Sequence, residues 1–341
     1  MKRARLTQID GALPNIALMK LAHWLRSQGW QAVVTRSLEP DLFENVKYDA
    51  VYGSCIFSFS QLRLMRFMRQ WPGCIVGGTG TPFKHTVEEI IGQSVYENYD
   101  YDGWTYDERG DIAFGESIGY TARGCRMSTP KSVCRNFCVV PDKEGRPFGV
   151  NTIAAIWRGK PWPKKLHLLD NDFFGNPEWR ERIAEIRDGG FKVCLSQGIN
   201  TRLVNDDAAK ALATIQYRNT KFNERKLYTA WDNFGDEGVF FRGVDCLERN
   251  GVPPKHLMAY MLVGCDQAET WLRIWHRFNR MVALEIEPYP MVFDRKRVDL
   301  LCFQRWVITG LYRIIPWDQY KRSTKSPESV AAWHEAMRKA A

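Results

Sequence analysis

The chain has 341 residues, with 45% hydrophobic and 26% charged side chains and a formal net charge of +9. That composition is typical of a globular protein and excludes a disordered one, and the length is sufficient for two domains. No apolar run approaches the roughly 18 residues of a membrane span, and the polar start MKRARLTQID lacks the core of a signal peptide. We therefore expect a cytoplasmic protein with no membrane partner.

The first part of the chain alternates strand-like and helix-like patterns. The strand-like runs are residues 4–9, 32–35, 50–57 and 74–77, and the clearest helical patterns between them are residues 17–28 and 61–70. Such alternation predicts a doubly wound parallel sheet with helices on both faces, which we place at residues 1–112.

Two features of this first domain have open interpretations. The glycine-rich turn IVGGTGT at residues 75–81 follows a strand, where such folds hold ligands, but tight turns also need glycine for backbone reasons. Residues 61–70 carry the densest basic face of the chain, at Arg63, Arg66 and Arg69, and we expect Leu62, Met65 and Met68 to be the apolar side of that helix. The positive charge permits nucleic acid as a partner and does not require it.

A segment rich in tyrosine, aspartate and glycine, residues 96–109, separates this domain from a second alternating series. The expected strands of the second series are residues 117–121, 165–169, 192–195, 226–230, 256–263 and 287–292. Its expected helices are residues 151–158, 177–187, 206–215, 236–249, 267–282 and 301–313. Six strand–helix units predict a partial (βα)6 TIM-like barrel at residues 113–320, with chemistry at the carboxyl ends of its strands. We expect residues 321–341 to be a polar tail or a surface helix.

Three of the nine cysteines lie within fourteen residues of one another, in the segment GYTARGCRMSTPKSVCRNFC. Eight residues separate Cys125 from Cys134, and three separate Cys134 from Cys138. A structural zinc site would ordinarily need a fourth Cys or His at a comparable spacing, and the sequence has none nearby. Three thiolates would leave one iron of a [4Fe–4S] cluster without a protein ligand and open to a cofactor or substrate.

This segment resembles the radical S-adenosylmethionine superfamily. The likeness consists of a strand that ends in Arg-Gly-Cys, a polar loop, and an aromatic residue, Phe137, directly before the last cysteine. The resemblance implies that the three cysteines hold a [4Fe–4S] cluster whose remaining iron chelates S-adenosylmethionine, with the main chain of Phe137 beside the adenine. The family's common spacing is three and then two residues, so this loop is six residues longer.

Later segments extend the resemblance. LLDNDFFG (168–175) ends the second strand and is implied to hold the methionine amino group, although such residues also cap helices. SQGINTR (196–202) is implied to meet ribose or carboxylate, and TAWDNFGDEG (229–238) is implied to contact the ribose through Asp232. LVGCDQAET (262–270) resembles the family's fifth strand and its turn. The implied cofactor-binding residues are Phe137, Asp170, Asn171, Asp172, Gln197, Asn200, Arg202, Asp232 and Gly264.

The first domain resembles the cobalamin-binding-like Rossmann domain that precedes many of these barrels. The matching segments are PNIALMKLAHWLRSQGW (14–30) and IVGG (75–78). The chain lacks the Asp-x-His-x-x-Gly motif whose imidazole ligates cobalt, and neither His23 nor His85 has that motif's neighbours. Cobalamin is therefore the less favoured cofactor.

Together these resemblances imply a radical S-adenosylmethionine enzyme. It would reductively cleave S-adenosylmethionine to a 5′-deoxyadenosyl radical that abstracts hydrogen from a small-molecule or nucleotide substrate, with an electron donor of the flavodoxin or ferredoxin type. Tyr289, Asp294, Arg295 and Arg297 lie near the end of the last strand and are candidates to face the substrate. The alternatives are a cobalamin-dependent radical methyltransferase and a non-catalytic iron–sulfur or zinc protein.

Overall fold

The computed structural model describes residues 1–40, 47–83, 85–107, 109–130 and 132–340. The chain divides into two compact units: unit 1 is Met1–Tyr120 with Ala155–Pro163, and unit 2 is Thr121–Ala154 with Lys164–Ala341. Both contain parallel strands with helices between them, which confirms the expected mixed α/β class. None of the helices in the described ranges is long and apolar enough to cross a membrane.

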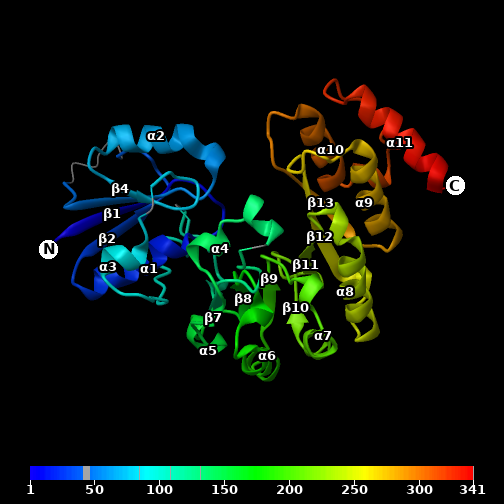
Figure 1. Cartoon of the computed structure of the whole chain (residues 1–341). Coiled ribbons are helices and arrows are strands. Elements are labelled where there is room, and N and C mark those ends of the chain that lie inside the picture. Colours follow the sequence, from blue (N-terminus) through cyan, green and yellow to red (C-terminus); the bar gives the residue numbers. More distant parts are fainter. Residues whose placement is uncertain (41–46, 84, 108, 131, 341) are drawn as a thin grey trace. The chain divides into compact units, whose positions relative to one another are not determined.

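Unit 1 is built on a four-stranded parallel sheet in the order β2-β1-β3-β4. Its strands are β1 (Arg3–Gln8), β2 (Gln31–Thr35), β3 (Ala50–Ser54), β4 (Ile75–Gly77) and, last in the unit, β5 (Ser117–Gly119), and its helices are α1 (Ile16–Ser27), α2 (Gln61–Gln70) and α3 (Val87–Ile91). Helix α2 lies on one face of the sheet, and α1 and α3 lie on the other (Figure 1). The strand order reverses between β1 and β3, so this point is the switch point at which such folds bind ligands.

Helix α2 presents a different face to the sheet from the one that the sequence suggested. Leu64 and Phe67 are its buried residues, whereas Leu62 is 81% exposed and Met65 is 53% exposed. The prediction that Leu62 and Met65 belong to the apolar side is therefore wrong. The ring of Phe67 packs so closely on β3 that a Cβ at Gly53 would lie 2.5 Å from it, and this contact sets the rotation of the helix.

Unit 2 contains most of the remaining elements. Its strands are β6 (Ala122–Arg123), β7 (Phe148–Gly149), β8 (Lys165–Leu168), β9 (Lys192–Leu195), β10 (Gln216–Tyr217), β11 (Leu227–Ala230), β12 (Leu257–Val263) and β13 (Glu287–Val292). Its helices are α4 (Val140–Lys143), α6 (Trp179–Asp188), α7 (Asp206–Ala213), α8 (Glu237–Arg249), α9 (Trp271–Ala283), α10 (Val298–Ile308) and α11 (Pro327–Ala340), and α5 (Ile153–Ile156) lies where the chain passes back to unit 1.

The strands of unit 2 run parallel in two adjoining groups, β10-β9-β8 and β11-β12-β13. The chain beyond β9 joins the groups, because the amide of Ile199 donates to the carbonyl of Tyr228 at 2.7 Å. The helices that follow the strands lie along one side of them (Figure 1). All carboxyl ends of these strands therefore point the same way, which places the loops after β8, β9, β11 and β12 at one edge.

Three expected helices differ in extent from the observed ones, and one of them, expected at residues 267–282, begins only at Trp271. The helix expected at residues 151–158 is only the four residues of α5. The helix expected at residues 301–313 begins earlier, as α10, and ends at Ile308, because Gly310 takes a φ of 73° that ends an α-helix. The predicted barrel is supported only as a set of parallel strands with helices, and its closure stays a prediction.

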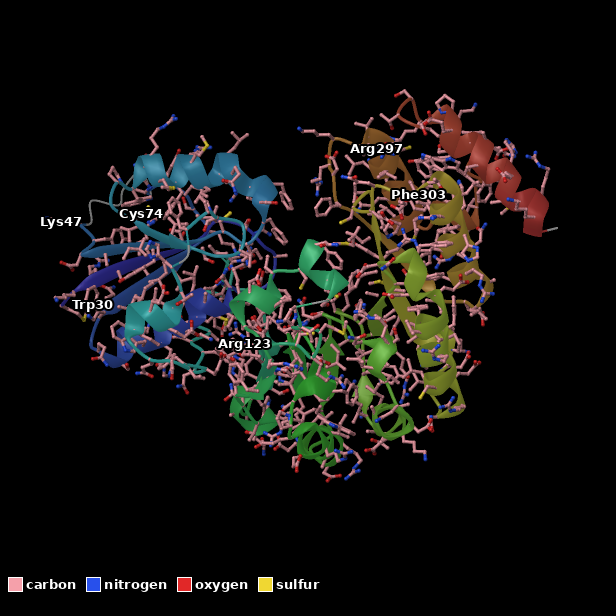
Figure 2. All side chains as sticks on the ribbon, in the orientation of Figure 1. Trp30, Lys47, Cys74, Arg123, Arg297 and Phe303 are labelled. Carbon is pink, nitrogen blue, oxygen red and sulfur yellow. The ribbon has the colours of Figure 1, made fainter. Side chains whose placement is uncertain are left out.

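The end of the chain is anchored by aromatic packing. Trp275 of α9 is fully buried, its indole donates to the carbonyl of Ser329 at 3.1 Å, and its ring lies 4.7 Å from that of Trp333 on α11. Phe303 of α10 packs edge-on against Trp275 in the same group of rings (Figure 2). Residues 327–340 are thus a helix that packs on α9.

This packing gives a first prediction. Trp333→Ala should lower the free energy of unfolding by about 1–3 kcal/mol, less than a fully buried tryptophan would, because Trp333 is half-buried. Arg338→Ala, an exposed position on the same helix, should change it by about 0.5 kcal/mol or less. Urea unfolding followed by tryptophan fluorescence and circular dichroism measures both, and equal effects would show that α11 does not support the core.

Candidate functional site

The three clustered cysteines lie close together in unit 2. Cys134 is buried, and Cys125 and Cys138 are half-buried. Burial is the main cause that raises the pKa of the Cys125 thiol to about 11, and Cys134 and Cys138 add to this electrostatically. The amide of Cys138 donates to the carbonyl of Cys134 at 2.7 Å. The structure therefore brings these three residues together, and their role as ligands stays a prediction.

The segment that carries the cysteines, residues 121–149 (the cysteine loop), is fastened to the end of β8 at its start. One carboxylate oxygen of Asp170 accepts from the amide of Thr121 at 2.9 Å, from its hydroxyl at 2.8 Å, and from the amide of Ala122. Asp172 accepts from the amide of Arg126 at 3.0 Å and from its guanidinium at 2.7 and 2.8 Å. Both carboxylates are almost fully buried.

The far end of the cysteine loop is fastened through Glu144. Its carboxylate accepts from the amide of Gly124 at 2.8 Å, from the guanidinium of Arg123 at 2.7 Å, and from the side-chain amide of Asn171 at 2.9 Å. These bonds hold the pKa of Glu144 below its usual range although burial opposes them. We call the side chains of Asp170, Asn171, Asp172 and Glu144 the loop clamp.

Residues that follow β9 also contact the cysteines. The guanidinium of Arg202 lies 3.6 Å from the sulfur of Cys134, and it also donates to Asn200 at 3.1 Å and to Asp236 at 3.2 Å. The sequence predicted Asn200 and Arg202 but missed Asp236, which forms the ion pair that orients Arg202. Gln197 is exposed.

Asp232 lies at the same edge, beyond β11. Its carboxylate accepts from the amide of Leu262 at 3.1 Å, and burial raises its pKa. Asp232 in turn contributes electrostatically to the raised pKa of the Cys138 thiol, so the two side chains are near neighbours. Phe137, 36% exposed, precedes that cysteine.

A buried arginine that the sequence did not reveal holds the ends of β11 and β12. Arg277 of α9 is fully buried and donates to the carbonyls of Trp231 at 3.0 Å and Leu262 at 3.0 Å. It is also ion-paired with Glu269, whose carboxylate accepts from the amide of Gly264 at 2.7 Å. Arg277 thereby fixes the backbone on both sides of Asp232 and Gly264.

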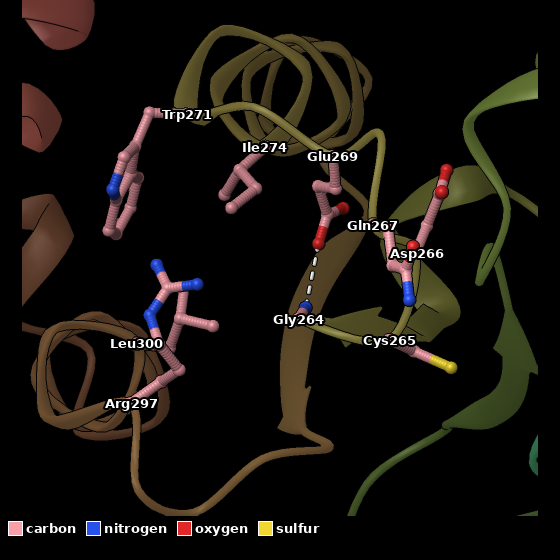
Figure 3. A pocket seen from close by; sticks show the side chains of 9 residues that line it. All are labelled: Gly264, Cys265, Asp266, Gln267, Glu269, Trp271, Ile274, Arg297 and Leu300. Carbon is pink, nitrogen blue, oxygen red and sulfur yellow. Dashed lines mark hydrogen bonds between the residues drawn. The ribbon is translucent and has the colours of Figure 1, made fainter.

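A cavity of about 170 Å³ opens beside this network. Figure 3 shows Trp271, Ile274 and Leu300 as its apolar walls, with Glu269 bonded to Gly264 on one side and Arg297 on another. Of the four residues expected to face a substrate, Arg297 lines this cavity, whereas Tyr289 packs edge-on against Tyr260 at 5.6 Å.

The switch point of unit 1 is filled by its own loops. Asp10, after β1, accepts from the amides of Ile56 at 2.8 Å and Phe57 at 2.9 Å. A Cβ at Gly78 would lie 2.2 Å from the carbonyl oxygen of Cys55, and one at Gly80 would lie 2.5 Å from the backbone of Phe57. These glycines of the IVGGTGT turn are therefore required by close backbone packing. His23 is bonded to Tyr96 at 2.6 Å.

The described residues contain no three His, Cys, Asp or Glu side chains that converge as the ligands of one metal ion do. The thiolates of a [4Fe–4S] cluster bind three different irons, so they are farther apart than ligands of a single ion. Three mutually interacting thiols on one fixed loop are a donor set that fits such a cluster.

Comparison with known proteins gives no relative: no family model matches the chain, and no curated protein matches its sequence. Fold and site alone therefore define the class, a two-unit α/β protein with a thiol-bearing loop at the carboxyl edge of parallel strands.

The loop clamp generates a prediction about pH. Burial raises the pKa of Asp170 to about 7 against hydrogen bonds that favour the charged form. The fold thus prefers the protonated carboxyl, so the contribution of Asp170 to stability is fully present near pH 4 and is lost as the pH rises to about 7. Asp170→Asn keeps the acceptor oxygen and removes the charge. The variant should gain stability relative to the native chain between those pH values, by about 4 kcal/mol at most. Urea unfolding at each pH measures the difference in free energy of unfolding between the variant and the native chain. A difference that does not change with pH would contradict the raised pKa of Asp170.

A second prediction concerns Arg277. Arg277→Met leaves the buried carboxylate of Glu269 without its cation and should lower the free energy of unfolding by about 3–5 kcal/mol. Adding Glu269→Gln should recover part of that loss. The matched control is Arg280→Met on the same helix, whose exposed pair with Glu237 should be worth about 1 kcal/mol or less. If the two arginine variants lose the same free energy of unfolding, Arg277 does not hold the ends of β11 and β12 in place.

Proposed function

We propose that the chain is a radical S-adenosylmethionine enzyme, with unit 2 as a partial (βα)6 TIM-like barrel and unit 1 as a cobalamin-binding-like domain. The observation that supports the proposal is the meeting of Cys125, Cys134 and Cys138 with Arg202 and Asp232 at the carboxyl edge of parallel strands. When bound, a [4Fe–4S] cluster and S-adenosylmethionine supply a 5′-deoxyadenosyl radical that abstracts hydrogen from a substrate.

The three cysteines would hold the cluster, and the loop clamp would fix their positions. The clamp bonds reach the cysteine loop before Cys125 at Ala122 and Gly124, directly after it at Arg126, and beyond Cys138 at Glu144. A longer chain between Cys125 and Cys134 would then cost little folding free energy. The free-energy cost of closing a loop rises by only about 0.6 kcal/mol for each doubling of loop length.

The cofactor's polar groups find complementary side chains at the same edge. The guanidinium of Arg202 is suited to a carboxylate, and Asp232 accepts hydrogen bonds of the kind that ribose hydroxyls donate. Asn200, Gln197, Phe137 and the main chain at Gly264 complete the proposed binding surface. The polar groups of Asp170, Asn171 and Asp172 bond to the cysteine loop, so we propose that they support the cofactor through that loop.

The buried surroundings of Asp232 also bear on the proposed chemistry. On the strand side its backbone is held by the fully buried Arg277, whose guanidinium donates to the carbonyl of Asp232 at 3.2 Å. Exclusion of water from such a site strengthens electrostatic contacts and limits side reactions of a reactive intermediate. An electron donor of the flavodoxin or ferredoxin type is the expected partner, and the switch-point packing of unit 1 makes cobalamin the less favoured cofactor.

The proposal is tested by anaerobic reconstitution. We expect about four irons per chain, with thiolate ligation from the three cysteines, and release of 5′-deoxyadenosine from S-adenosylmethionine when dithionite is added. Asp232→Ala should weaken binding of S-adenosylmethionine at unchanged iron content, as measured by equilibrium dialysis and iron assay.

Two results would contradict the proposal. The first is full iron loading in a chain with Cys125, Cys134 and Cys138 all changed to alanine. The second is tight zinc binding by the native chain, with no iron–sulfur absorbance, which would favour a structural metal protein.

A further inference from the structure

Two exposed phenylalanines lie at the carboxyl edge of the sheet of unit 1. Phe57 is 40% exposed and Phe59 is 60% exposed, and their rings stack with centroids 4.9 Å apart and planes 10° from parallel. The loop that carries them is fixed, because the amide of Phe57 donates to Asp10 at 2.9 Å and a Cβ at Gly80 would lie 2.5 Å from the backbone of Phe57. Large apolar side chains that are held at a surface in this way are typical of a binding site.

Three arginines continue the surface along α2. The 3₁₀ turn that contains Phe59 runs directly into this helix, so side chains three or four positions apart are neighbours. Phe59 is followed at that spacing by Arg63, Arg66 and Arg69, which are all exposed. Arg63 is also bonded to the edge itself, because its Nε donates to the carbonyl of Ile9 at 2.8 Å. We define the aromatic–arginine face as Phe57, Phe59, Arg63, Arg66 and Arg69.

The loop after β4 is bonded to the same surface. The hydroxyl of Thr79 donates to the carbonyl of Ile56 at 2.7 Å, and the side-chain amide of Gln61 donates to the carbonyl of Gly80 at 2.5 Å. The glycine-rich turn IVGGTGT therefore supports the loop of the two phenylalanines and the start of α2 together. The aromatic–arginine face is one continuous surface for this reason.

The face is positively charged because this part of the chain lacks acidic residues. Residues 50–87 contain three arginines, one lysine and no aspartate or glutamate. The next acidic residue, Glu88, belongs to α3, on the opposite side of the sheet from α2 (Figure 1). In the described part of the chain, the arginines of the face have one acidic partner, Glu39, which contacts Arg66 at 2.6 Å in an exposed ion pair. Exposed pairs are weak, so the face is complementary to an anionic partner.

We propose that the aromatic–arginine face binds a single-stranded polynucleotide, whose bases stack on the phenylalanine rings and whose phosphates accept from the arginines. An aromatic ring offers a surface on which any base can stack, and a guanidinium matches the geometry of a phosphate. A duplex fits less well because its bases are already stacked on one another. An acidic protein would account for the arginines and not for the parallel pair of exposed rings. Neither contact requires a 2′-hydroxyl, so strands of DNA and RNA should both bind.

The test measures the fluorescence anisotropy of labelled oligo(dT) and oligo(U) strands of about twelve residues, titrated with the full chain. Arg66→Glu/Arg69→Glu should weaken binding of both strands by about tenfold or more. It should also make the slope of log K against log salt less steep by about 1.4, since each lost phosphate contact contributes about 0.7. The matched control, Lys210→Glu/Arg242→Glu, makes the same change of charge at exposed positions of α7 and α8 and should bind like the native chain.

Stacking is tested separately at Phe59. Phe59→Ala should weaken binding by about tenfold, whereas Phe59→Tyr keeps a ring for the base and should bind like the native chain. Urea unfolding should show that each variant retains the native fold, because the substituted side chains are exposed.

Four results would overturn the proposal. They are a native chain that binds neither strand at low ionic strength, native affinity in the alanine and arginine variants, equal affinity for a duplex, and displacement of the strand by polyglutamate as readily as by unlabelled strand. The last result would favour an acidic protein as the partner. Binding in this assay requires neither iron nor S-adenosylmethionine, so its outcome is independent of the proposed function.

Discussion

The hydrogen bonds between the end of β8 and the cysteine loop are the interaction on which the candidate site depends. In its described residues the loop has little regular structure of its own, apart from a two-residue strand pair, a 3₁₀ turn at Val133–Asn136 and one turn of α-helix. Its position is set instead by Asp170, Asp172 and Glu144, which bind its backbone directly. Hydrogen bonds to charged groups are each worth about 1.5–3 kcal/mol, so the bonds of Asp172 and Glu144 together are sufficient to order the loop.

A second set of buried charges fixes the opposite side of the site. Arg277 reaches from α9 to the backbone that follows β11 and β12, and its charge is compensated by Glu269. A buried charge without partners would destabilise the fold. Arg277 avoids this because its guanidinium donates to carbonyl oxygens and is paired with a carboxylate. The cysteines and Asp232 meet between two rigid supports, which explains why Cys138 is affected electrostatically by a residue almost a hundred positions away.

The sequence predicted the strands well because parallel strands leave long apolar runs, and it predicted the convergence of the cysteines because three thiols so close along a chain share one loop. It could not predict what Asp170, Asn171 and Asp172 bind, since their partners depend on the path of the cysteine loop. Arg277 was missed because RIWHRFNR carries a charge at nearly every turn. A signal was present, however: Arg277 is three residues from Ile274 and four from Met281, inside the buried stripe of α9.

The positions of the clamp bonds explain how an eight-and-three spacing is compatible with a fixed set of thiols. The bonds attach before and just after Cys125 and again at Glu144, beyond Cys138, so they hold both ends of the segment that carries the three cysteines. Cys134 is then positioned from two directions, by its carbonyl bond to Cys138 and by the guanidinium of Arg202 beside its sulfur. The positions of the thiols are therefore set by contacts with residues far along the chain as well as by their spacing in the sequence, and the buried carboxylates of unit 2 provide several of these contacts.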